Sequence, residues 1–130
     1  MGSSFIEYRG YGFWSADAFI ERLARETAAA IEKQTNNEAW QADLAAHWRA
    51  QASGNFNGWI HLDLDEFLTG EERRAQIRDV VQSVTKEYAE EDPIYRTGLL
   101  LVRLLDGELQ TNATSPLGYM VGTHPSRPKI

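Results

Sequence analysis

The sequence contains no cysteine. Disulfide frameworks, zinc sites with thiolate ligands and catalytic cysteines are therefore excluded. It also has no apolar run that approaches the roughly 18–20 consecutive residues of a membrane span. Its first seven residues lack the basic end and the apolar stretch of a secretory signal. We therefore expect a cytoplasmic protein that does not bind a membrane.

Motifs of the common enzyme classes are missing as well. No phosphate loop and no dinucleotide-binding fingerprint occurs, and Gly10-Tyr11-Gly12 precedes no apolar strand. Ser53, Ser83 and Ser115 lack the glycine-flanked context of an activated serine nucleophile. We therefore expect neither a catalytic site nor a cofactor.

The composition is that of one globular domain. The chain has 130 residues, of which 42% are hydrophobic and 25% are charged. A chain of this length removes roughly 65–70% of its unfolded surface from water on folding. We predict a single domain over residues 1–130, with a tail rich in glycine and proline that frays from about residue 122.

Apolar residues recur at spacings of three and four through four segments, which is the pattern of amphipathic helices. The predicted helices cover about 16–34, 38–52, 70–90 and 93–106. The last is leucine-rich on nearly every side, which is typical of a buried central helix. We considered a hairpin turn at Asp106-Gly107, but the polar arm that follows pairs poorly with a leucine-rich strand. The sequence thus predicts an all-α fold, a small bundle of about four helices.

Side chains suited to capping precede each predicted helix. Ser15 and Asn37 stand before the first and second helices, and Asp92-Pro93 opens the last one. Thr69 with Glu72 three residues later has the spacing of a capping box. We predict that these residues satisfy the first backbone amides of their helices.

The segment before the first helix is aromatic and interrupted by Gly10 and Gly12, which argue against a helix there. We predict an irregular entry to the bundle. Exposed aromatic side chains often dominate binding surfaces. The three that we expect to be partly exposed are Tyr8, Tyr11 and Trp14.

Polar and apolar residues alternate over 59–65, which favours an extended segment that leads into a short turn at 66–68. His61, Asp63 and Asp65 would then point to one side, as the ligands of a metal ion do. The alternative is that they simply face water while Ile60, Leu62 and Leu64 face the core. We favour this second interpretation.

The net charge of −6 comes from one stretch of the chain, which we call the acidic band. Between Asp63 and Asp92 there are ten acidic residues and four basic ones, while the remainder has nine of each. Such a stretch disfavours nucleic acid as a partner and suits a protein with a basic surface. A solvated helix surface without a partner is the simpler alternative.

This acidic, cysteine-free and tryptophan-rich chain resembles the immunity proteins of bacterial polymorphic toxin systems. The segments that carry the resemblance are YRGYGFW at 8–14 and LDEFLTGEER at 64–73. The resemblance implies a cytoplasmic protein that binds and neutralises a toxin domain, often by presenting acidic residues to a basic active site. Immunity proteins have many folds, so the resemblance assigns no site residues.

Three hypotheses follow from the sequence. The first is a protein-binding module, and the second is a metal-binding protein or metal-dependent enzyme centred on His61, Asp63 and Asp65. The third is a structural or oligomerising helical domain, whose partner is a second copy of the chain. The candidate binding residues of the first hypothesis are Tyr8, Tyr11, Trp14, Asp63, Asp65, Glu66, Glu71, Glu72, Glu90 and Glu91.

Overall fold

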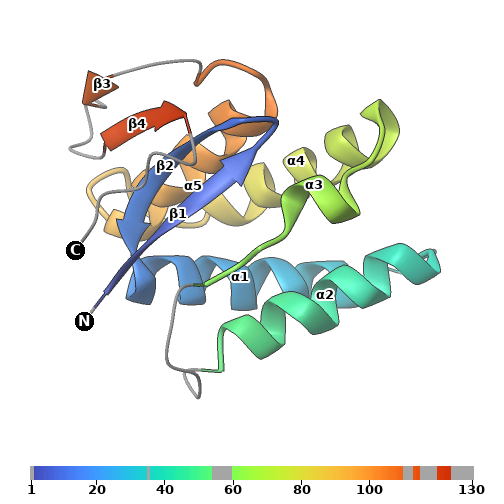
Figure 1. The fold of residues 1–130 in the computed structure, drawn as a ribbon. Coiled ribbons are helices and arrows are strands. Elements are labelled where there is room, and N and C mark those ends of the chain that lie inside the picture. Colours follow the sequence, from blue (N-terminus) through green and yellow to red (C-terminus); the bar gives the residue numbers. More distant parts are fainter. Residues whose placement is uncertain (1, 35, 54–59, 110–112, 115–119, 124–130) are drawn as a thin grey trace.

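A computed structural model describes residues 2–34, 36–53, 60–109, 113–114 and 120–123. Five helices and four short strands occur in this part of the chain (Figure 1). None of these helices is long and apolar enough to cross a membrane. In chain order the elements are β1 (Ser3–Tyr8), β2 (Tyr11–Ala16), α1 (Asp17–Glu32), α2 (Ala39–Gln51), α3 (Leu64–Phe67), α4 (Glu71–Thr85), α5 (Pro93–Leu105), β3 (Ala113–Thr114) and β4 (Met120–Thr123).

The prediction of an all-α fold is wrong, because the aromatic N-terminal segment forms a β-hairpin. β1 and β2 pair antiparallel, with Phe5 opposite Trp14. Arg9 and Gly10 connect them with φ values of 54° and 89°, and two positive φ values are what a tight type I′ hairpin turn requires. The glycine that argued against a helix is therefore equally a hairpin signal. The protein is a mixed α and β domain.

The sheet has the strand order β1-β2-β4-β3, and all neighbouring strands are antiparallel. Along β1 the buried residues are Ser4, Ile6 and Tyr8, at the alternation expected when one face of a strand packs on a core. β1 and β2 contact α5, and β2 also contacts α1 (Figure 1). Gly122 and Thr123 of the predicted frayed tail belong to β4, and residues 124–130 lie outside the described part.

The four predicted helices are present as α1, α2, α4 and α5, and three of them match closely. α4 ends at Thr85, five residues earlier than predicted, where the amides of Glu87 and Tyr88 bond to carbonyls only three residues back. Three of the four residues that follow Tyr88 are acidic, so this segment offers no apolar face to extend the helix.

α5 is the buried central helix that the sequence predicted. Its residues Leu100, Leu101, Val102, Leu104 and Leu105 are at most 5% exposed. It ends at Leu105, and Gly107, two residues further on, has a φ of 77°. The amide of Gly107 bonds to the Leu104 carbonyl, and the amide of Glu108 bonds to the Arg103 carbonyl, which is the Schellman pattern of a helix end.

Three of the four predicted caps are wrong. Ser15 lies inside β2, and its buried hydroxyl bonds to that of Thr97 at 3.0 Å. Asn37 instead donates to the Ile31 carbonyl at the end of α1, while Glu38 precedes α2. Gly70, not Thr69, occupies the cap position of α4, and no side chain caps it.

The Asp92 prediction is confirmed. Its Oδ1 accepts the Ile94 amide at 2.8 Å, and Pro93 begins the helix. This cap depends only on adjacent residues, whereas the strand that holds Ser15 depends on pairing with β1.

The segment before α3 has the orientation predicted for its apolar residues. Ile60, Leu62 and Leu64 are buried, and residues 60–63 form neither a helix nor a strand. The Ile60 amide donates to Ser4 Oγ at 2.9 Å, and the Leu62 carbonyl accepts Trp48 Nε1 at 2.9 Å. The segment is thus held between β1 and α2.

Candidate functional site

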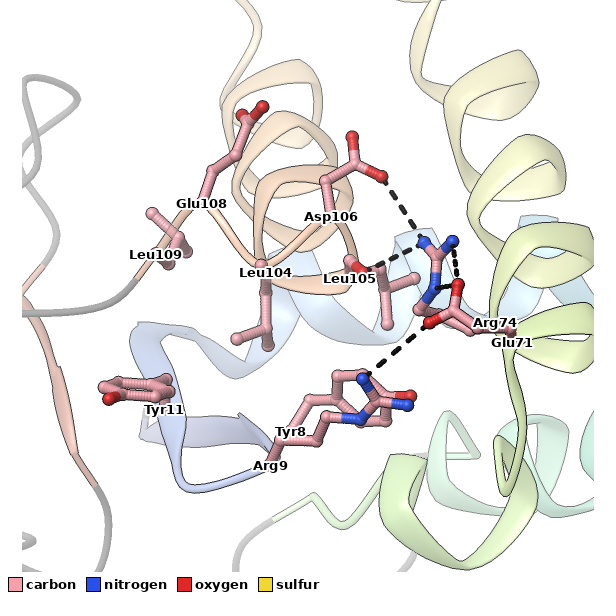
Figure 2. A pocket seen from close by; sticks show the side chains of 11 residues that line it. Tyr8, Arg9, Tyr11, Glu71, Arg74, Leu104, Leu105, Asp106, Glu108 and Leu109 are labelled. Atoms are coloured by element: carbon pink, nitrogen blue, oxygen red, sulfur yellow. Dashed lines mark hydrogen bonds and ion pairs between the residues drawn. The ribbon is translucent and has the colours of Figure 1, made fainter.

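The three arginines of the acidic band turn toward the body of the protein. Arg74 is only 19% exposed, and its guanidinium donates to Glu71 at 2.7 Å and to the Leu105 carbonyl at 3.1 Å. It also lies 3.6 Å from Asp106. The first turns of α4 are thereby tied to the end of α5 (Figure 2).

Arg78, one helical turn further along α4, faces the same way. It bonds to both carboxylate oxygens of Asp106 at 3.0–3.2 Å and to Gln82 at 2.6 Å. Arg73 covers the Trp40 ring, with its guanidinium carbon 4.7 Å from the ring centre. All three arginines of the acidic band therefore serve contacts within the molecule.

Most of the acidic side chains of the band face water instead. Within the described part of the chain, five exposed carboxylates have no hydrogen-bond or ion-pair partner. Because the arginines are used internally, the net negative charge of the band is displayed at the surface. These five residues are Glu66, Glu72, Glu87, Glu90 and Glu91.

Three other predicted site residues are used within the molecule. Asp63 Oδ2 lies 2.7 Å from His47 Nε2, and Asp65 Oδ1 accepts the Arg9 amide at 3.0 Å. Glu71 is held by Arg74, and this hydrogen bond lowers the pKa of the Glu71 carboxyl although desolvation opposes it. These carboxylates connect elements and are less available to a partner than the five exposed ones.

The proposed metal ligands border a shallow hollow of about 180 Å³ beside β1. His61 contributes main-chain contacts there, since its amide donates to Gln51 and its carbonyl lies 2.8 Å from His47 Nε2. Asp63 and Asp65 have the partners described above. No group of three or more His, Asp or Glu side chains in the described residues is placed to hold a metal ion.

The aromatic residues of the hairpin differ in exposure. Tyr8 was expected to be partly exposed but is buried, and its hydroxyl donates to the Leu68 carbonyl at 3.2 Å. It lies on the inner side of β1 because residues 4, 6 and 8 share one face. Tyr11 and Trp14 are half-buried, and Trp14 meets the Phe5 ring edge-to-face at 5.2 Å.

A pocket of about 580 Å³ lies where the hairpin turn, the start of α4 and the end of α5 meet, and we call it the hairpin pocket (Figure 2). Its apolar lining includes Tyr8, Tyr11, Leu104 and Leu109. The remaining lining residues are Arg9, Glu71, Arg74, Leu105, Asp106, Gly107 and Glu108. The pocket adjoins the acidic band through Glu71.

This pocket was not predicted from the sequence, although two signals for it were present. Arg74 and Arg78 are spaced by four and so share one face of α4, where one acidic or carbonyl partner can meet both. Asp106-Gly107 marks the helix end that supplies both. The third wall is formed by the hairpin, which the sequence analysis did not predict.

Arg9 stands at the opening of the hairpin pocket. Its guanidinium lies 4.9 Å from the Tyr8 ring centre and 3.9 Å from Glu71 Oε1, and its side chain is 54% exposed. Glu108 lies on the opposite rim and is exposed.

Comparison of the chain with models of protein families, with curated proteins and with solved structures finds no match.

Proposed function

We propose that this protein is a protein-binding module whose acidic band binds a basic surface on its partner. The observation that carries the proposal is the separation of charge within the band. Its arginines are turned onto Trp40, Glu71 and Asp106, while Glu72, Glu90 and the neighbouring carboxylates are exposed and unpaired among the described residues.

Such a surface suits a partner with an excess of lysine and arginine. Complementary charge speeds diffusional encounter and selects against acidic partners. The resemblance to immunity proteins makes a toxin domain with a basic active site the specific partner class that we propose. The binding would take place in the cytoplasm, and neutralisation would follow from covering that site.

Charge reversal at residues without structural partners tests the proposal. The Glu72→Lys and Glu90→Lys double variant changes the band by four charge units without breaking any ion pair described above. Glu21→Lys with Asp43→Lys makes the same change on α1 and α2 and is the matched control. We expect the first variant to slow association with the partner at least tenfold at low salt, and the control to have a much smaller effect.

The partner is sought among the proteins that bind to the immobilised wild-type protein and to both immobilised variants. It is then purified, and its association rate with each is measured by stopped flow. Co-expression supplies the biological assay, since a toxic partner should arrest growth unless the wild-type protein is also made. Equal association rates for both variants, or rates independent of ionic strength, would refute a role for the acidic band.

A further inference from the structure

The hairpin pocket has two kinds of wall. One is apolar and is formed by Leu104, Leu109 and the rings of Tyr8 and Tyr11. The other is charged and includes Glu71 on α4 and Glu108 just beyond α5 (Figure 2). A guest that fits both walls has an apolar stem and a charged end.

The charge of that end follows from which rim groups are already paired. Arg74 is held by Glu71, Asp106 and the Leu105 carbonyl, and Arg9 lies beside Glu71. Glu108 is exposed and has no ion-pair partner in the part of the chain that the structure describes. An anion would therefore meet three carboxylates and two guanidinium groups that each already lie beside one of them, whereas a cation would find one carboxylate without a partner among the described residues.

The end of α5 adds to this preference. The pocket adjoins the C-terminus of the helix, where the macrodipole is equivalent to about half a negative charge. Tyr11 is half-buried in the apolar wall, and the face of a tyrosine ring attracts a guanidinium or ammonium group. Arginine also packs its methylene stem on apolar surface while its head stays near water.

We propose that the hairpin pocket receives an arginine side chain of the protein partner, with its stem on Leu104 and Leu109 and its guanidinium toward Glu108 and the Tyr11 ring. This inference rests on the proposed function, because it supplies the anchor residue of the same basic partner. It adds a specific contact beside Glu71 of the acidic band, where general charge attraction alone would not select one residue.

Capped amino acids test the pocket without the partner. N-acetyl-arginine methylamide, and the leucine and glutamate analogues, are titrated into the 15N-labelled full chain at millimolar concentrations. We expect the arginine probe to shift the amide resonances of Gly107, Glu108 and Leu109 with higher affinity than either analogue. Glu108→Gln should weaken this binding by about two- to fivefold, and Glu90→Gln, a carboxylate outside the pocket, should leave it unchanged.

Several results would overturn the inference. A leucine probe that binds as tightly as the arginine probe would make the pocket an apolar site, and a glutamate probe that binds more tightly would make it an anion site. Equal weakening by both glutamine variants would reduce the effect to general charge attraction. Unshifted resonances around Gly107 would show that the pocket takes no such guest.

The two proposals fail in different ways. The Glu72→Lys and Glu90→Lys variant retains every residue of the pocket, so its binding of the arginine probe should equal that of the wild type. If the partner depends on the band but the probe does not bind, the pocket inference alone is wrong. If the probe binds but the charge reversal does not change the association rate of the partner, the proposed role of the acidic band in binding is wrong.

Discussion

The charged side chains at the two ends of α4 differ in whether they form ion pairs. At the first end Glu71, Arg74, Arg78 and Asp106 form a continuous set of ion pairs that ties α4 to the end of α5. Beyond the other end Glu87, Glu90 and Glu91 are exposed and have no such partners among the described residues.

One acidic stretch can therefore both stabilise the fold and present negative charge at the surface. Carboxylates that meet a half-buried arginine stabilise the fold, because breaking the pair leaves a charged group partly desolvated. Exposed carboxylates contribute little to stability, because water solvates them in the folded and the unfolded chain alike. Substitutions at the paired end should therefore lower the stability of the fold, whereas substitutions at the exposed end should change binding and leave stability nearly unchanged.

The largest expected effect comes from forcing α4 and α5 apart. A Cβ added at Gly98 of α5 would overlap Thr85 Oγ1 at the end of α4. We expect Gly98→Ala to lower the free energy of unfolding by about 1–3 kcal/mol, because overpacking moves helices or side chains. Urea denaturation followed by circular dichroism measures the loss.

A second variant shows whether the clash is the cause. Thr85→Ala removes the hydroxyl that the new methyl group would meet, at the loss of its bond to the Val81 carbonyl. In the double variant, Gly98→Ala should therefore cost much less than it does alone. Additive losses would mean that the helices do not approach each other as closely as described.

Removing the shared partner of the two arginines tests the paired end. Asp106→Ala removes the carboxylate that Arg78 contacts at 3.0 Å and leaves Arg74 with the Glu71 carboxylate, and these two arginines are only 25% and 19% exposed. We expect a loss of about 1–2 kcal/mol, reduced by the removal of an unfavourable negative charge at the C-terminus of α5. Glu90→Ala, at the other end, should change stability by less than about 0.5 kcal/mol. Similar denaturation midpoints for both variants would contradict the difference in stability that we expect between the paired and the exposed end of α4.

The helix caps provide a smaller test. Asp92→Ala removes the acceptor of the Ile94 amide and should cost about 1 kcal/mol. Thr69→Ala should change the unfolding free energy by less than about 0.5 kcal/mol, because Thr69 is exposed and does not cap α4. A loss for Thr69→Ala that matches the loss for Asp92→Ala would restore the capping box that the sequence predicted.

The smallest expected effect is a pH dependence at Glu71. The hydrogen bond from Arg74 lowers the pKa of Glu71 in the folded chain below its ordinary value of 4.5. This contribution to stability is therefore complete above pH 4.5 and is lost as the pH falls through the lowered folded value. Glu71→Gln should remove it and flatten the acid limb of a plot of unfolding free energy against pH. Glu90→Gln is the control and should retain the wild-type slope.

The helices were predictable because their signals are local. The apolar spacing of α1, α2 and α5 and the Asp92-Pro93 start of α5 depend on residues within a few positions of one another. The negative charge of the band was also visible, although its division into paired and exposed carboxylates was not. That division depends on Asp106, which is 28 residues from Arg78 in the chain.

The helical segments can be located from the amino-acid sequence alone, as can the absence of thiol chemistry and the acidic character of residues 63–92. The hairpin over residues 3–16, the bond between Ser15 and Thr97 and the pocket beside Arg9 become visible only in the folded chain. The physical reason is the range of the interactions. A helix satisfies its amides within one segment, whereas strands, ion pairs between helices and pockets require partners that the chain brings together only on folding.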